Sequence, residues 1–240
     1  MTPKPFLQSI GMQFDAKPAQ LNNRFYKSLA EEQQEHVDDI WERKAMGLAT
    51  NTELYAIPVT IKQAARLYSF DSARYKASLK WFSEVMAATK PSRVFEVGAG
   101  AGITSAYLKK LHYDLEVSGI EQHTNLAQIA KYTFGSSIQV GDYLVVEGDC
   151  SHDLVVCDFG FDIENLPPST KPHSTAEVDG YKYCPGCAED LGETMQPYFE
   201  KWKSWMNENG KLAVAGRFSN VGMVYAALVS AQAAGLRPIE

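Results

Sequence analysis

The stretch FEVGAGAGIT, Phe95 to Thr104, places a carboxylate at Glu96 and then three glycines at alternate positions, Gly98, Gly100 and Gly102. A strand that ends in glycines and opens a helix is a nucleotide-binding signature, although a lone glycine pattern is weak evidence. The glycines would let a ligand approach the backbone closely. A simpler alternative stays open here, in which Glu96 is a paired charge and the glycines form an ordinary turn.

The residues around this stretch alternate between two patterns. From Arg93 onward, short β-rich runs alternate with helical ones: RVFEVG, ITSAYLKKL, LEVSGIE, TNLAQIAKYTF, SIQVGD and DLVVCDF. The alternation continues, after a long irregular segment, with the helix ETMQPYFEKWKSWMNE, the strand KLAVAGR and a helix from about Asn220 to Ala234. This predicts an α/β fold with a doubly wound, mostly parallel sheet. Ligands of such sheets lie at the carboxyl ends of the strands.

The end of the third strand is ambiguous, because GDYLVVEGD contains two Gly-Asp pairs. A parallel crossover needs about a dozen residues, and only Cys150 to His152 separate Asp149 from the next strand. We therefore place the strand end at Asp142, with Asp149 as the alternative.

The first ninety residues have helical character. Apolar spacing predicts a charged surface helix over residues 21–48, a second from Pro58 to about Tyr68, and a third that Asp71 and Ser72 can cap and that reaches Thr89. The expected organisation is a helical cap over residues 1–90 and a ligand-binding domain over 91–240.

The composition narrows the class of protein. A chain of 240 residues with 45% hydrophobic content is long enough for one well-buried domain with an appendage. A net charge of −6 disfavours nucleic acid as a partner. No leader-like or membrane-length apolar run is present, so we expect a cytoplasmic protein without a membrane partner. The oligomeric state is not readable.

The spacing of the glycines separates two cofactor classes. A dinucleotide fingerprint needs glycine at its first, third and sixth positions, which here are Gly98, Gly100 and Ile103. The β-branched Ile103 counts against NAD or FAD. The alternate pattern ExGxGxG instead resembles the first motif of the class I S-adenosylmethionine-dependent methyltransferases.

The neighbouring strand ends extend this resemblance over about Arg93 to Ala234. The second strand ends in VSGIEQ, which places Glu121 nineteen residues after Gly102, near the spacing expected for a ribose-binding carboxylate. SIQVGDY resembles the family's adenine-side strand, and HDLVVCDFGF the strand beside the transferable methyl group. The resemblance implies S-adenosyl-L-methionine as cofactor and this cofactor-binding set: Glu96, Gly98, Ala99, Gly100, Gly102, Glu121, Gln122, Asp142, Tyr143, Asp158 and Phe159.

The sequence departs from the family pattern in two places. It stops at GLRPIE, where the fold usually continues into a final antiparallel strand pair, so we expect that pair to be missing. CDFGF also lacks the Asn/Asp-Pro-Pro-aromatic motif of many amino-group methyltransferases, and the acceptor atom is therefore not readable.

The acceptor side offers fewer signals. Asp158 is the first candidate for orienting or deprotonating the acceptor, with simple cofactor contact as the alternative. The segment 162–190 is long for a connection, and the resemblance implies that it covers the acceptor. Tyr181, Tyr183 and His173 are its candidate substrate residues, and His152 is a further candidate base. Tyr68, Arg74 and Tyr75 would contact the ligand or form an ordinary packing stripe.

Four cysteines remain to be placed, and only Cys184 and Cys187 are spaced for joint chemistry. Their CxxC spacing suits half a zinc site, which would need His173, Cys150 or another distant ligand to complete it. A redox pair is disfavoured because the motif is expected in a loop rather than at a helix start. The simplest interpretation is that Cys184 and Cys187 are two loop cysteines beside a Pro-Gly turn and bind no metal.

The favoured function is an S-adenosylmethionine-dependent methyltransferase acting on a small molecule or a protein side chain. A non-catalytic module that binds the cofactor or its product, a nicotinamide oxidoreductase and an aminopropyl transferase stay as alternatives.

Overall fold

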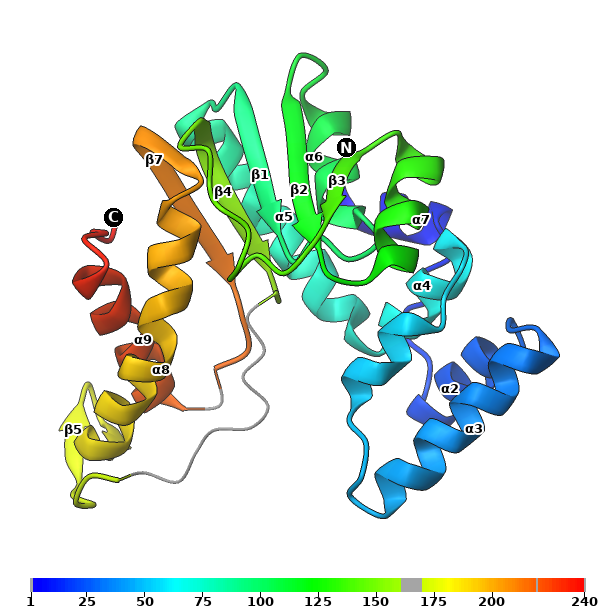
Figure 1. The fold of residues 1–240 in the computed structure, drawn as a ribbon, viewed down its shortest axis with the longest axis horizontal. Helices are drawn as coiled ribbons and strands as arrows, with labels where there is room; N and C mark the ends of the chain where they lie inside the picture. Colours follow the sequence, from blue (N-terminus) through cyan, green and yellow to red (C-terminus); the bar gives the residue numbers. More distant parts are fainter. Residues whose placement is uncertain (1, 161–169, 219, 240) are drawn as a thin grey trace.

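A five-stranded parallel sheet forms the centre of the molecule (Figure 1). The computed structural model describes residues 2–160, 170–218 and 220–239. The strands lie in the order β3-β2-β1-β4-β7. Their bounds are β1 Arg93–Val97, β2 Glu116–Glu121, β3 Ser137–Val140, β4 His152–Asp158 and β7 Met206–Ala215. The predicted doubly wound, parallel α/β architecture is confirmed, and the order reverses between β1 and β4.

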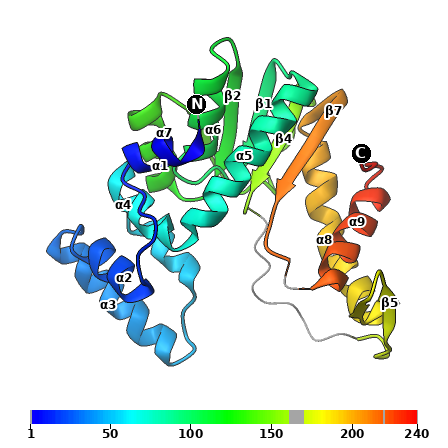
Figure 2. The ribbon, with the colours of Figure 1, turned by 180° about the vertical axis from the view of Figure 1, so that it is seen from behind.

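Helices cover both faces of the sheet (Figures 1 and 2). One face carries α5 (Ser72–Thr89), α6 (Ile103–Leu111) and α7 (Thr124–Phe134), and the other carries α8 (Pro185–Lys203) and α9 (Val221–Ala233). Successive side chains of a strand point to opposite faces. In β4, Leu154 and Val156 accordingly join the first core, while Val155 packs with Trp202 in the second.

The connection from β3 to β4 contains turns and no helix between residues 141 and 151. The strand itself ends at Val140, and Asp142 follows two residues later, where its Oδ1 accepts the backbone N–H of Leu144 at 2.8 Å. This agrees with the choice of Asp142 over Asp149 as the residue beside the strand end.

The N-terminal region is helical, but its helices are shorter than expected. Its elements are α1 Pro3–Ser9, α2 Pro18–Tyr26, α3 Glu31–Ala45, the 3₁₀ helix η1 Asn51–Ala56, α4 Ile61–Leu67 and the 3₁₀ helix η2 Tyr68–Asp71. A single helix over 21–48 is therefore wrong. The chain turns after Tyr26, and Gln34 of α3 donates its side-chain amide to the carbonyls of Tyr26 and Leu29. The turn allows Phe25 to pack with Val37 and Ile40 in a small separate core.

Two of the N-terminal helices differ from the prediction at their first turns. The second helix begins at Ile61 rather than Pro58, because Thr60 caps it by accepting the N–H of Gln63. The third spans Ser72–Thr89 and ends at Thr89 as predicted, but Ser72 is its first residue rather than a cap. Its preceding Asp71 makes no side-chain cap and accepts Arg217 instead, at 2.9 Å.

The segment predicted as irregular over 162–190 is partly regular. Residues 162–169 lie outside the described part of the chain. A small antiparallel hairpin follows, with β5 at Ala176–Val178 and β6 at Tyr181–Tyr183, and α8 then begins at Pro185. Figures 1 and 2 place this hairpin at one end of α8, on the opposite side of the molecule from α2 and α3.

Among the helices described, none is long and apolar enough to cross a membrane.

Candidate functional site

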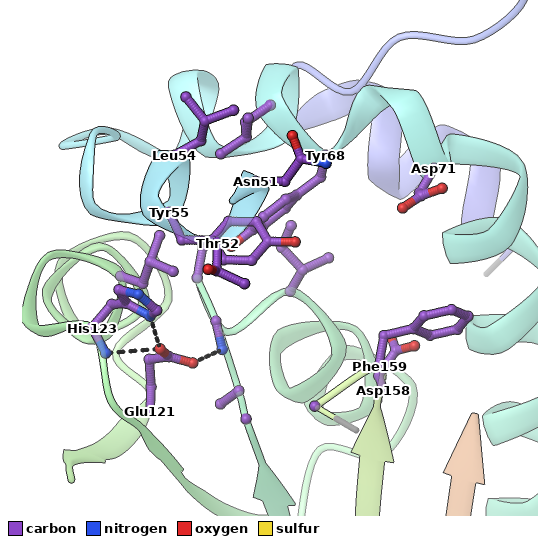
Figure 3. A pocket seen from close by; sticks show the side chains of 18 of the residues that line it. Asn51, Thr52, Leu54, Tyr55, Tyr68, Asp71, Glu121, His123, Asp158 and Phe159 are labelled. Carbon is purple, nitrogen blue, oxygen red and sulfur yellow. Dashed lines mark hydrogen bonds and ion pairs between the residues drawn. The ribbon is translucent and has the colours of Figure 1, made fainter. Parts of the chain in front are cut away.

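A cavity of about 710 Å³ opens at the carboxyl ends of β1, β2 and β4. Every residue of the predicted cofactor set lines it except Gly102, the residue that precedes α6. The N-terminal helices contribute the remaining wall, with Tyr55 and Tyr68 facing Glu121 and Asp158 across the opening (Figure 3). The structure therefore brings four separate strand ends and the helical cap to one place.

The glycine turn has a backbone that other residues adopt only with strain. Gly98 and Gly102 have φ values of +64° and +70°. A Cβ at Gly98 would lie 2.8 Å from the Cα of Gly160, and one at Gly102 would lie 2.7 Å from the Cβ of Ala130. The first glycine thus keeps two strand ends close together, and the third lets α6 pack on α7.

Glu96 is buried beneath the turn and is 2% exposed. Its Oε2 accepts the backbone N–H of Ser105 at 2.9 Å and also the Ser105 hydroxyl. Burial raises the pKa of the Glu96 carboxyl to about 8, against the opposing effect of the Ser105 hydrogen bonds. The carboxyl therefore ties β1 to the first turn of α6, a partner that the sequence did not identify.

Glu121 lies on the opposite side of the glycine turn, at the end of β2. Its Oε2 accepts the backbone N–H of Gly100 at 2.8 Å. Its Oε1 is within hydrogen-bonding distance of the backbone N and ring Nδ1 of His123, at 2.8 and 2.7 Å (Figure 3). A carboxylate has about four acceptor positions, so at least one remains for a ligand hydroxyl.

Asp142 and Tyr143 form the wall beyond β3. The Tyr143 hydroxyl donates to the carbonyl of Gly160 at 2.8 Å, and its ring lies near Trp202 of α8. Burial raises the pKa of the Tyr143 phenol, so it stays a neutral donor. Asp149 is absent from this wall and accepts the N–H of Ser151 instead.

Asp158 at the end of β4 is 7% exposed. Its Oδ2 accepts the Thr104 hydroxyl at 2.7 Å, and its Oδ1 lies 3.2 Å from Nη1 of Arg74. Burial raises the pKa of the Asp158 carboxyl, and the Arg74 charge opposes this shift. A buried carboxylate with a raised pKa is a better proton acceptor than an exposed one.

Arg74 of α5 is held between two aromatic rings. Its guanidinium carbon lies 4.0 Å from the ring centroid of Tyr75 and 3.6 Å from that of Phe159. Phe159 has a φ of +61°, which turns the chain as it leaves β4. All three residues line the cavity, and Tyr75 also packs against the core beneath it.

Three tyrosines of the helical cap form a roof over the glycine turn. Tyr68 stacks on Tyr75 with centroids 5.6 Å apart and meets Tyr55 edge-on at 6.0 Å. A Cβ at Gly100 would lie 3.1 Å from the Tyr68 hydroxyl. Sequence reasoning missed Tyr55 and also Asn51, Thr52 and His123. His123 follows Glu121 by two residues, so the motif around Glu121 could have pointed to it. No sequence pattern around Tyr55, Asn51 or Thr52 predicts that they line the cavity.

The predicted substrate residues lie elsewhere. None of Tyr181, Tyr183 and His173 is among the residues that line the cavity. Tyr181 is exposed, and Tyr183 packs on Tyr225 of α9 with centroids 5.4 Å apart. His152 is buried at the start of β4, the end of the strand away from the cavity.

The cysteine motif has a different setting from the expected one. Cys184 follows β6 and directly precedes α8, so the motif does lie at a helix start after a strand, contrary to the expectation. His173 Nδ1 lies 3.7 Å from the Cys184 sulfur and 3.3 Å from the Cys187 sulfur. Hydrogen bonds from the backbone N–H groups of Cys187 and Ser174, together with His173, lower the pKa of the Cys184 thiol to about 6.

Comparison with known proteins gives matches among solved structures alone. No family model and no curated protein sequence matches the chain. A candidate S-adenosyl-L-methionine-dependent methyltransferase from Methanococcus maripaludis aligns at 14% identity over 74% of this chain and 70% of its own, with a TM-score of 0.44.

Two further structures align less completely. A sugar N-methyltransferase from Streptoalloteichus gives 14% identity over 60% of this chain and 49% of its own, with a TM-score of 0.41. An S-adenosylmethionine-bound amino pentose methyltransferase from Micromonospora echinaspora aligns at 14% identity over 59% of this chain and 50% of its own, with a TM-score of 0.39. The chain thus spans about half the length of these two. All three are named methyltransferases.

Proposed function

We propose that the protein is an S-adenosylmethionine-dependent methyltransferase whose acceptor is a small molecule or a protein side chain. The observation that carries this proposal is the convergence of Glu96, Glu121, Asp142 and Asp158 from four neighbouring parallel strands onto one cavity around the glycine turn. The carboxylates of Glu121, Asp142 and Asp158 suit a ligand that has a sulfonium and an ammonium group and no phosphate. Ile103, buried at the sixth motif position, disfavours a dinucleotide.

The cofactor would lie along the carboxyl edge of the sheet. Glu121 would accept the ribose hydroxyls, joining or displacing the His123 ring. The first turn of α6 would face the methionyl carboxylate, because helix N-termini favour anions. Asp142 and Tyr143 would border the adenine, and Gly98, Ala99 and Gly100 would allow close backbone approach. Glu96 would act from beneath, by holding α6 in place rather than by direct contact.

The acceptor would enter near Asp158 and Phe159. The cofactor supplies an activated methyl group whose sulfur leaves without assistance, so the chain's main task is to hold the acceptor collinear with that methyl group and exclude water. Asp158 would orient the acceptor or take its proton. Arg74 would fix the position of the Asp158 carboxylate, and the Tyr55, Tyr68 and Tyr75 rings would keep the site dry.

Turnover can be tested without knowing the acceptor. The purified protein would be incubated with methyl-labelled S-adenosylmethionine and either a small-molecule extract or a protein fraction, and S-adenosylhomocysteine would be quantified. We expect product only when protein and one acceptor pool are both present, with Asp158→Asn reducing the rate. Glu116→Gln is the control, because Glu116 is an exposed carboxylate at the start of β2 and does not line the cavity.

Two negative results have different meanings. Binding of the cofactor without turnover in either pool would reject catalysis and support the non-catalytic module. Failure to bind S-adenosylmethionine or S-adenosylhomocysteine would reject the assignment of the cavity altogether.

A further inference from the structure

A cluster of three metal-ligating side chains lies outside the proposed cofactor cavity. The ring Nδ1 of His173 and the sulfurs of Cys184 and Cys187 all lie within 4.8 Å of one another. None of these residues lines the 710 Å³ cavity. The cluster therefore needs an explanation that is independent of methyl transfer.

The distances fit a tetrahedral ion. With Zn–S near 2.3 Å and Zn–N near 2.0–2.1 Å, a tetrahedral zinc site has a nitrogen–sulfur edge of about 3.6 Å. The observed nitrogen–sulfur distances are 3.7 Å for Cys184 and 3.3 Å for Cys187. Two thiolates and one imidazole form a donor set typical of zinc. We propose that His173, Cys184 and Cys187 bind one Zn²⁺ ion, with the fourth position open to water or another donor.

The local fold explains why an ion is useful at this place. The β5-β6 hairpin has only three residues in each strand, and an isolated two-stranded hairpin is marginally stable in water. His173 precedes the first strand, Cys184 follows the second, and Cys187 lies in the first turn of α8. One ion would close the base of the hairpin and attach it to the helix. Binding of a structural metal contributes directly to the folding free energy of such a unit.

Backbone donors converge on the sulfur of the first cysteine in the cluster. The N–H groups of Cys187 and Ser174 donate to the Cys184 sulfur. Cys184 and Cys187 also lie at the N-terminal end of a 19-residue helix, where negative charge is favoured. A disulfide between the two cysteines would leave the approach of His173 to both sulfurs unexplained.

The test is the metal content of the full chain, purified under reducing conditions with zinc and dialysed against metal-free buffer. We expect about one zinc ion per chain, and loss of it in Cys184→Ser, Cys187→Ser and His173→Ala. Cys150→Ser is the matched control, because Cys150 is exposed and lies before β4, where its thiol donates a hydrogen bond to the backbone carbonyl of Ser204. That variant should keep the metal.

A second measurement separates loss of the site from loss of the fold. Cobalt added to the metal-free wild type should give the visible absorption of tetrahedral thiolate-bound Co²⁺, and Cys184→Ser should lack it while keeping the far-ultraviolet circular dichroism of the α/β domain. Wild-type protein that holds neither zinc nor cobalt would overturn the proposal. A Cys184–Cys187 disulfide in that protein, detected as a mass loss of two hydrogens, would assign the pair to redox chemistry instead. Equal metal loss in Cys150→Ser would also contradict the assigned ligands.

Discussion

The Glu96 carboxyl accepts hydrogen bonds from Ser105 of α6, and its pKa lies well above the ordinary value. Burial keeps the pKa of its carboxyl near 8 in the folded chain, whereas the ordinary value is 4.5. Below about pH 4.5 the carboxyl is protonated in both states, and its contribution to stability is fully present. Between these two values the unfolded chain releases the proton first, so stability falls as pH rises and levels off above pH 8.

The substitution Glu96→Gln tests this directly. The amide oxygen can still accept from Ser105, but it cannot ionise. We expect the unfolding free energy of the variant, relative to wild type, to rise between pH 5 and pH 8 by up to roughly 1.4 kcal/mol per pH unit, and its relative melting temperature to rise with it. Parallel melting curves for the two proteins over this range would contradict the buried-carboxyl account.

Gly102 provides a second prediction at the residue scale, with a matched control. Gly102→Ala combines a positive φ with a collision against Ala130, so we expect a loss of about 2–4 kcal/mol of unfolding free energy. Gly135→Ala has a similar φ of +64° and no neighbour within 4 Å, and should cost about 1 kcal/mol. Urea unfolding of both variants measures the difference. Equal losses would mean that the contact between α6 and α7 contributes nothing.

At the scale of elements, the pair between Arg74 and Asp158 joins helix α5 to the end of β4. Because Asp158 is almost fully buried, removal of Arg74 alone leaves a buried charge without its partner. We expect Arg74→Met to lower the unfolding free energy by about 3–5 kcal/mol. Adding Asp158→Asn should recover part of this loss, which a double-mutant cycle in urea would measure. Additive losses would show that the two residues act independently.

Sequence patterns predicted most elements in and around the sheet because strands and glycine turns have local signatures. The end of the third strand near Asp142 and the end of α5 at Thr89 are examples. The division of 21–48 into α2 and α3 was not predictable, because it depends on Gln34 reaching carbonyls at the end of the preceding helix and on a small core around Phe25. The start of α8 at Pro185 was missed for a related reason. A Cys-Pro-Gly-Cys stretch predicts a turn when it is taken alone, and the hairpin that precedes the helix start has no strong signal in the sequence.

For the whole molecule, the candidate site was predictable where it follows the strand ends and not where it comes from the cap. Glu96, Glu121, Asp142 and Asp158 each end or follow a recognisable β-rich run. Tyr55 and Asn51 reach the cavity only because the N-terminal helices fold over the sheet edge, a long-range arrangement without a local pattern. His173 was named both as a substrate residue and as a possible partner of the cysteine pair, and it lies beside the two cysteines.

The central claim is that the cavity binds a sulfonium cofactor through Glu121. The most direct measurement is isothermal titration of the full chain with S-adenosylmethionine, S-adenosylhomocysteine and NAD, repeated on Glu121→Ala and on the control Glu116→Ala. We predict micromolar-range binding of the two sulfur compounds by wild type and control, a loss of at least about tenfold in Glu121→Ala, corresponding to 1.4 kcal/mol, and no binding of NAD. Binding of NAD, or binding of S-adenosylmethionine that Glu121→Ala leaves unchanged, would contradict the account.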